Sequence, residues 1–288
     1  MSEIERYAVP RSLEEAAEIL RAGDVMILAG GTDLMPQIRA GRLRCQPVMM
    51  NVRRVPEMCG IAQEGGVVRI GALVTITELH ESALVRERLN LLWQACDHFA
   101  SDQIRNAATL GGNLCNASPA GDTLVPLLAL DAQAVLAAKP NGALKLRRVA
   151  LQEFFVGPGR TCRAPAEILA AVEVPLPPAG FAGEFYKHGT RPGLDIAAIS
   201  IAAGARRDGG VLRDVRVAFG SVAPTPIRAP RTEAALEGRA PDEATLEAAA
   251  RVALAEVHPI SDVRASDWYR RELVHNMLKR VLAHVGQG

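Results

Sequence analysis

Two short segments with paired glycines carry the residues of this chain whose types and spacing are best suited to chemistry. The first is Leu28-Ala-Gly-Gly-Thr-Asp-Leu34, and the second runs from Thr109-Leu-Gly-Gly-Asn113 to Asp122. Glycine lets main-chain N–H groups approach a ligand closely, and successive N–H groups in a turn form a concave anion site. One glycine pair alone is typical of a plain turn. Two such segments, each with an aspartate after the glycines, favour a nucleotide cofactor whose diphosphate is held from two sides.

Two common nucleotide-binding motifs do not fit these segments. Gly30-Gly-Thr-Asp33 lacks the G-x-G-x-x-G spacing of a Rossmann unit, and Pro36 follows it closely. A P-loop requires a lysine after its second glycine, and neither segment has one. We therefore exclude both folds.

The composition is that of an ordinary globular protein. Of the 288 residues, 49% are apolar and 23% are charged, and the formal net charge is +1. Nucleic-acid binding would need a concentrated basic face, which this near-neutral charge argues against. No apolar run reaches the roughly 18 residues needed to span a bilayer, and the N-terminus is acidic where a signal peptide is basic. We expect a cytoplasmic protein with no transmembrane segment and no nucleic-acid partner.

The five cysteines are dispersed, with no C-x-x-C pair and no Cys/His cluster. This spacing argues against a zinc site or an iron–sulfur cluster held by this chain alone, and it indicates free thiols in a cytosolic protein. Cys115 lies inside the second glycine segment, where plain packing is the favoured interpretation. No nucleophile–base pair for substrate chemistry stands out, so we assign no catalytic residue.

The elements expected to position the glycine segments occupy the first 177 residues. Capping boxes at Ser12–Glu15 and Thr75–Glu78 predict two helix starts, the first helix ending at Ala22. Further helical stretches are expected at Leu84–Phe99 and Thr123–Leu130. Short apolar or alternating runs predict strands at Val25–Ala29, Met49–Val52, Gly65–Thr75, Ala132–Ala138, Leu144–Val149 and Ile168–Val174.

Beyond the prolines at 175–178 the pattern changes to strands followed by helices. The expected strands are Phe181–Thr190, Ile196–Arg207 and Val211–Ser221, with a turn at Asp208-Gly-Gly210, and the expected helices are Asp242–Val257 and Asp267–Val285. This order favours an α+β chain. We divide it into residues 1–57, 58–177 and 178–288.

Three groups of residues together resemble one known family. They are Leu28–Leu34, Thr109–Asn113 with Asp122, and Phe185-Tyr-Lys-His-Gly-Thr-Arg191 followed by Asp195-Ile-Ala. In order and spacing they are similar to the FAD-binding medium subunit of the molybdenum hydroxylases, which include xanthine dehydrogenase and aerobic carbon monoxide dehydrogenase. The resemblance covers nearly the whole chain. It implies a two-part FAD-binding domain of the PCMH (vanillyl-alcohol-oxidase-like) type, followed by a three-stranded antiparallel sheet with helices.

The resemblance also implies which residues contact the cofactor. The first segment would wrap the FAD diphosphate with its backbone: Leu28, Ala29, Gly30, Gly31, Thr32, Asp33 and Leu34. The second would grip it from the opposite side: Thr109, Gly111, Gly112 and Asn113. The remaining contacts would be a hydroxyl partner at Asp122, cavity walls at Phe99 and Ala100, an adenine neighbour at Leu169, and isoalloxazine neighbours at Lys187, Asp195 and Ile196. Phe99 and Leu169 fit an ordinary core equally well, and Lys187 an ordinary salt bridge.

The implied function is electron transfer within a larger enzyme. FAD would be non-covalent, since the first segment contains no histidine or cysteine. Substrate would be oxidised at a molybdenum cofactor in a large subunit, and electrons would pass through two [2Fe–2S] clusters of a small subunit to FAD and an external acceptor. Two such heterotrimers would pair. A self-sufficient FAD-dependent oxidase or reductase and a non-enzymatic nucleotide-binding module remain open alternatives. Thr32-Asp33 replaces the His-Ser pair usual in carbon monoxide dehydrogenases, so carbon monoxide is not the favoured substrate; substrate and acceptor stay open.

Overall fold

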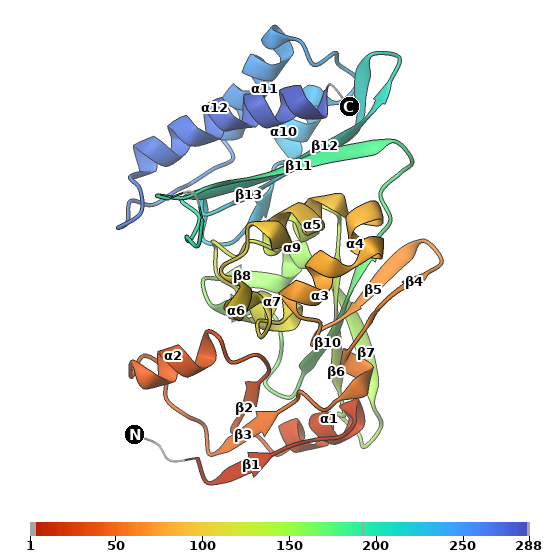
Figure 1. Ribbon diagram of the computed structural model, residues 1–288, viewed down its shortest axis with the longest axis vertical. Helices are drawn as coiled ribbons and strands as arrows, with labels where there is room; N and C mark the ends of the chain where they lie inside the picture. Colours follow the sequence, from red (N-terminus) through yellow and green to blue (C-terminus); the bar gives the residue numbers. More distant parts are fainter. Residues whose placement is uncertain (1–3, 192, 287–288) are drawn as a thin grey trace.

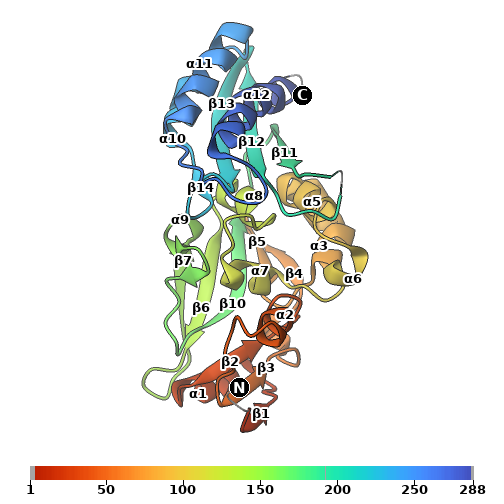
Figure 2. The same cartoon turned by 90° about the vertical axis from the view of Figure 1, so that its left-hand side faces the viewer.

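The computed structural model describes residues 4–191 and 193–286. Three main sheets follow one another along the long axis of the molecule, from the N-terminal part to the C-terminal helices (Figure 1), and a quarter turn shows the same order (Figure 2). Helices and strands are mixed throughout, as the sequence predicts. The first three residues of the acidic N-terminal stretch lie outside the described ranges. Within those ranges, no helix is long and apolar enough to cross a membrane.

The N-terminal part is a small parallel sheet with strand order β1-β3-β2. Its elements are β1 (Arg6–Ala8), α1 (Leu13–Arg21), β2 (Val25–Leu28), α2 (Leu34–Arg39) and β3 (Val48–Asn51). The apolar stripe of α1 is buried and packs toward the neighbouring sheet. The expected first helix and both expected strands are confirmed to within a residue, whereas β1 and α2 had no clear sequence signal.

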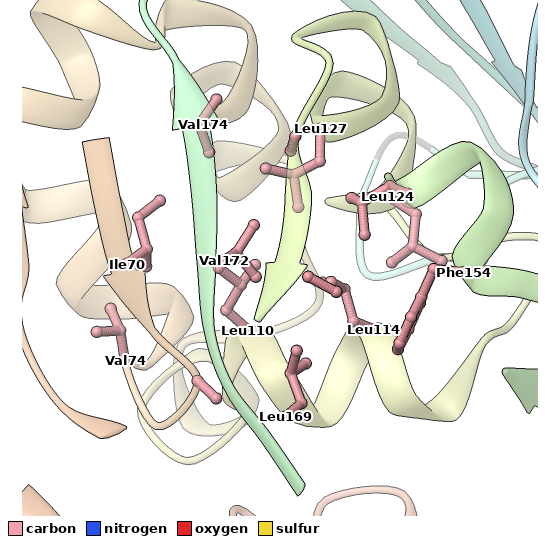
Figure 3. Packing of buried hydrophobic residues seen from close by; sticks show 14 of the residues in the cluster. Ile70, Val74, Leu110, Leu114, Leu124, Leu127, Phe154, Leu169, Val172 and Val174 are labelled. Carbon is pink, nitrogen blue, oxygen red and sulfur yellow. The ribbon is translucent and has the colours of Figure 1, made fainter. Parts of the chain in front are cut away.

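The middle part is a five-stranded antiparallel sheet with order β4-β5-β10-β6-β7. The strands are β4 (Ile61–Glu64), β5 (Val67–Gly71), β6 (Gln133–Ala138), β7 (Lys145–Ala150) and β10 (Ile168–Pro175). The helices and a small hairpin are η1 (Pro56–Met58), α3 (Ile76–Glu81), α4 (Ala83–Arg88), α5 (Asn90–Asp97), α6 (Asp102–Arg105), α7 (Leu110–Asn116), α8 (Leu124–Ala129), α9 (Leu151–Phe154), β8 (Phe155–Gly157) and β9 (Arg160–Thr161). In the core, Leu110 and Leu114 of α7 pack with Leu169 and Val172 of β10 (Figure 3).

The C-terminal part is an antiparallel sheet with order β11-β12-β13-β14, covered by helices. Its elements are β11 (Phe181–His188), β12 (Ile199–Asp208), β13 (Val211–Gly220), β14 (Ile227–Arg228), α10 (Pro230–Leu236), α11 (Glu243–Leu254) and α12 (Asp267–Val285). One face of the sheet packs under α10 and α12, and the other contacts α5 and α8 of the middle part. Small residues on this second face, including Ser200, Ala202 and Gly220, let the middle part approach closely.

Two expected elements of the middle part are divided in the structure. The helix expected over Leu84–Phe99 is α4 followed by α5, because Leu89 leaves the helical conformation (φ −130°, ψ 50°) while its side chain remains fully buried. The strand expected over Gly65–Thr75 is shorter: β5 ends at Gly71, whose backbone lies directly against Met58.

Two further expectations are corrected. The C-terminal sheet has four strands instead of three, because β14 pairs with β13 opposite Ala218 and Phe219. A strand of two residues is too short to show an alternating pattern in the sequence, so it was not predicted.

The capping box at Thr75 is confirmed in full. The one at Ser12 is half formed, since the Glu15 carboxylate accepts from Arg11 N instead.

We predict that Gly71→Ala destabilises the fold through backbone crowding. A Cβ at Gly71 would overlap the Met58 carbonyl and lie 2.7 Å from the carbonyl carbon of Cys59, which are main-chain atoms that cannot swing aside. The expected loss in the free energy of unfolding is about 1–3 kcal/mol, measured by urea denaturation. Gly66→Ala in the same β4–β5 hairpin is the control, because a Cβ there meets nothing within 4 Å. Equal stability of the two variants would contradict this account.

Candidate functional site

The first glycine segment connects β2 to α2 and presents a row of open amides. In the described part of the chain, the five consecutive N–H groups from Gly30 to Leu34 have no hydrogen-bond acceptor. Gly31 adopts φ +72°, a left-handed conformation that favours glycine. Four of these five residues are half-buried and Asp33 is exposed, so a ligand can reach their amides. Five unpaired ones in a turn form a concave site for an anion.

The second glycine segment is built differently, because it is the first turn of α7. Thr109 caps this helix, and its Oγ1 accepts from Gly112 N at 3.0 Å. The other amides are also paired: Leu110 N donates to Val74 O, Gly111 N to Ala72 O and Asn113 N to Thr109 O, at 2.9–3.0 Å. A Cβ on Gly111 would lie 2.7 Å from Ala72 O. This glycine therefore serves packing, and the expectation of two equivalent rows of phosphate-binding amides does not match the geometry.

The two segments nevertheless meet in space. A Cβ on Gly30 would overlap the carbonyl of Ala107, which lies just before the cap Thr109. Only glycine permits this approach of main chain to main chain. Figure 2 shows α2, which follows the first segment, lying below α7. The fold thus brings together two motifs about eighty residues apart, as the sequence predicts, although Ala107 itself carries no sequence signal for the contact.

A buried ion pair joins the end of the second segment to the C-terminal sheet. Lys187 Nζ of β11 lies 2.6 Å from Asp122 Oδ2 and donates to His98 O at 3.0 Å. The two side chains are only 8% and 10% exposed. Burial raises the pKa of Asp122 from 3.8 to about 6, although the charge of Lys187 acts to lower this pKa. Both residues were expected beside the cofactor, and the structure pairs them with each other.

The second carboxylate oxygen of Asp122 is an orphan. Asp122 Oδ1 is buried and has no hydrogen-bond partner among the described residues. Leaving a buried acceptor unsatisfied is costly. The oxygen is therefore suited to accept from a hydroxyl donor supplied by a ligand.

Three other expected site residues have structural explanations. Leu169 is 3% exposed and belongs to the β10 core shown in Figure 3. Phe99 is also buried, and Ala100 follows it at φ +34°. Arg105 donates to Phe99 O at 2.9 Å and so fixes this bend. Leu169 is accounted for by core packing, whereas Phe99 and Ala100 shape the chain just ahead of the second segment.

Asp195 and Ile196 lie in the connection between β11 and β12. The Asp195 carboxylate accepts from Thr190 Oγ1 at 2.7 Å, from Thr190 N at 2.5 Å and from Ile196 N at 2.9 Å. These hydrogen bonds lower the pKa of Asp195 to about 2. Asp195 thus shapes its own loop, and Ile196 is 51% exposed. Neither touches the Asp122–Lys187 pair.

The donor set fits a nucleotide cofactor. The open amides of the first segment suit a diphosphate, and the orphan oxygen of Asp122 suits a hydroxyl. The second segment supplies a wall and a helix cap instead of further amides. This division of roles could not be read from the two glycine pairs, which look alike in sequence.

Comparison with known proteins agrees with this fit. Residues 2–177 match the model described as the FAD binding domain in molybdopterin dehydrogenase, and residues 184–285 match the CO dehydrogenase flavoprotein C-terminal domain. The chain is 34% identical to the xanthine dehydrogenase FAD-binding subunit of Escherichia coli O157:H7, covering 98% of this chain and 96% of that one. It is 32% identical to the carbon monoxide dehydrogenase medium chain of Hydrogenophaga pseudoflava, covering 96% and 95%.

A solved structure shows the same likeness in three dimensions. It is the carbon monoxide dehydrogenase of Hydrogenophaga pseudoflava that lacks the Mo-pyranopterin moiety of the molybdenum cofactor, with a TM-score of 0.92, 33% identity and coverage of 98% of this chain and 97% of that one. Both family models together span almost the entire chain. The chain therefore belongs to the family of FAD-binding medium subunits of the molybdenum hydroxylases, and it is an oxidoreductase subunit.

Proposed function

We propose that this chain holds FAD non-covalently and passes electrons from the [2Fe–2S] clusters of a small partner subunit to an external acceptor. The observation that carries this proposal is the row of open amides from Gly30 to Leu34, together with the orphan oxygen of Asp122. Bound FAD would supply a redox group that exchanges electrons singly or in pairs. The substrate would be oxidised at a molybdenum cofactor in a large subunit; the match to a domain of molybdopterin dehydrogenases and the molybdenum cofactor named for the similar carbon monoxide dehydrogenase support this.

The first segment would bind the cofactor diphosphate. Its amides have no protein acceptor, and Gly31 adopts a φ of +72° that a residue with a side chain rarely adopts. Leu28 and Ala29 lead the chain from β2 into the turn, and Leu34 begins α2 behind it. The residues themselves do no chemistry: they orient the cofactor and neutralise its charge through main-chain dipoles.

Asp122 and Lys187 would hold one hydroxyl of the cofactor. Asp122 Oδ1 would accept from the hydroxyl, and Lys187 would keep the carboxylate charged through Oδ2. Lys187 already has two protein acceptors, so we propose that it acts on the cofactor through Asp122 more than directly. Thr109, Gly112 and Asn113 would form the facing wall, with Asn113 fixed by the Thr123 hydroxyl at 2.7 Å.

Non-covalent attachment is supported by the chemistry of the cysteine in the second glycine segment. The first segment has no histidine or cysteine. Cys115 lies in α7, and burial raises the pKa of its thiol, which keeps it protonated and unreactive.

The assembly is part of the same proposal. We infer a small [2Fe–2S] subunit and a large molybdopterin subunit, paired as two heterotrimers in the cytoplasm, because closed two-fold assemblies are the commonest. The three main sheets support a division at 1–57, 58–177 and 178–288, the first two parts forming an FAD-binding domain of the PCMH type.

We predict that Gly31→Val abolishes FAD retention while the chain stays folded. Valine cannot adopt φ +72° without strain, and its Cβ would lie 3.1 Å from Leu28 Cδ1, so the turn must change. The expected loss in affinity is at least about tenfold, ~1.4 kcal/mol, measured by flavin absorbance after gel filtration with circular dichroism as the folding check. Gly23→Val is the matched control, since Gly23 has φ +82° but lies in the α1–β2 turn, before β2 and outside the first glycine segment. If both variants keep FAD equally, the first segment is only a turn.

We predict a pH dependence of stability that depends on Asp122. The pKa of Asp122 rises from 3.8 to about 6 on folding, so the folded state binds more protons than the unfolded state between these values. The contribution of this group to the free energy of unfolding is therefore present below about pH 4 and is lost as pH rises through about 6. Urea titrations of the FAD-free chain should show this loss, and Asp122→Asn should lack it. The same slope in both proteins would show that Asp122 is not the group responsible.

We predict that the chain alone binds FAD without turnover. It should not oxidise NADH, aldehydes or hydroxylatable heterocycles, because the proposed electron source lies in partner subunits. Co-expressed with those subunits, it should elute from gel filtration at several times its 30.7 kDa mass. Robust substrate oxidation by the isolated chain would favour a self-sufficient flavoenzyme instead.

A further inference from the structure

Ser221 is a strained residue at the boundary between the middle and C-terminal parts. It follows β13 at φ +63°, a conformation that is uncommon for a residue other than glycine and persists only where its surroundings enforce it. Ser221 N donates to Pro119 O at 2.8 Å, and Ser221 Oγ donates to Ala197 O at 3.0 Å. One buried residue thus ties together two segments that are distant in the sequence.

Arg270 completes the same junction from the first turn of α12. Its guanidinium is 4% exposed, and Nη1 donates to Ser221 O at 2.6 Å and to Ala198 O at 2.8 Å. Nη2 pairs with Asp262 Oδ1 at 2.7 Å. A buried guanidinium with a carboxylate and two carbonyl partners is a rigid connector, because removing any partner leaves a buried charge unsatisfied.

The segments joined here adjoin residues that the sequence resemblance places beside the cofactor. Pro119 belongs to the stretch that leads into Asp122, and Ala197 and Ala198 directly follow Asp195 and Ile196. Ala198 N donates to His188 O at 2.7 Å and so closes the base of the connection between β11 and β12. A short chain of hydrogen bonds through Ser221 and Arg270 therefore connects Pro119 with Ala197 and Ala198.

We propose that Arg270 and Ser221 are positioning residues that couple the Pro119–Asp122 segment to the Leu194–Ala198 segment. The inference rests on the proposed FAD site. A ligand that orders Asp122 also orders Leu194–Ala198, and it does so through Ser221 and Arg270 without touching either residue. Arg270 donates to one carbonyl of the Leu194–Ala198 segment, that of Ala198, and to the carbonyl of Ser221, which itself contacts both segments through Pro119 O and Ala197 O.

Hydrogen–deuterium exchange with and without FAD tests the coupling. In the unaltered chain, FAD should slow exchange in peptides covering both 119–122 and 194–198. In Arg270→Lys, FAD should still bind and still slow exchange at 119–122, but the slowing at 194–198 should be lost. Arg271→Lys is the matched control: Arg271 is the next residue of α12 and donates to Leu254 O at 3.1 Å, away from both segments.

Ser221→Gly provides a second variant that relieves the strained φ and removes the Oγ hydrogen bond to Ala197. It should fold even if Arg270→Lys does not, and it should also lose the slowing at 194–198. Retention of that slowing in the folded variants would overturn the coupling and leave the proposed function intact. Faster exchange spread evenly over α10, α11 and α12 would show a purely structural role and also overturn it. Absence of FAD binding by the unaltered chain would overturn the proposed function as well.

Discussion

The row of unpaired amides after β2 is the constraint on which the site depends. The N–H groups from Gly30 to Leu34, at half-buried or exposed residues, have no acceptor in the described part of the chain and so remain free to bind a ligand. Two glycines with different tasks hold them open. Gly31 provides the left-handed turn, and Gly30 allows the carbonyl of Ala107 to close in from the middle part. The parallel pairing of β2 with β3 then fixes where the turn begins.

The Asp122–Lys187 pair is the second constraint, because it places charge where little water reaches. A buried ion pair is weak evidence for stability, since the desolvation of both groups opposes their attraction. Here one carboxylate oxygen has the lysine and the other has nothing. Such an arrangement is better explained by a ligand than by the fold alone, and it lies where the C-terminal sheet meets the middle part. The close approach of these two parts depends on small residues such as Ser200 and Gly220.

Much of the fold could be predicted from the sequence wherever neighbouring residues alone determine a helix start or a turn. The capping box at Thr75, the helix after Ser12 and the Asp208–Gly210 turn are decided by residues next to one another, and the structure confirms them. The pairing of the two glycine segments was also foreseeable from their shared chemistry. By contrast, a Leu-Gly-Gly-Asn run disfavours a helix, and α7 forms there because carbonyls of Ala72 and Val74 accept its first amides.

Other features had no signal because their partners are far away in sequence. Asp122 and Lys187 are 65 residues apart, and each was expected to meet the cofactor separately. The contact of Gly30 with Ala107 involves main-chain atoms only, so no side chain in the sequence indicates it. The break at Leu89 divides an otherwise continuous amphipathic pattern, because this residue leaves the helical conformation while its side chain stays fully buried.

Residue-resolved amide exchange on the isolated chain, with and without FAD, separates the roles of the two glycine segments. The amides from Gly30 to Leu34 should exchange rapidly without FAD and become protected when it binds. The amides from Leu110 to Asn113 should be protected in both states, because protein acceptors already hold them. Protection that appears on FAD binding at Leu110–Asn113, with none gained at Gly30–Leu34, would contradict these roles.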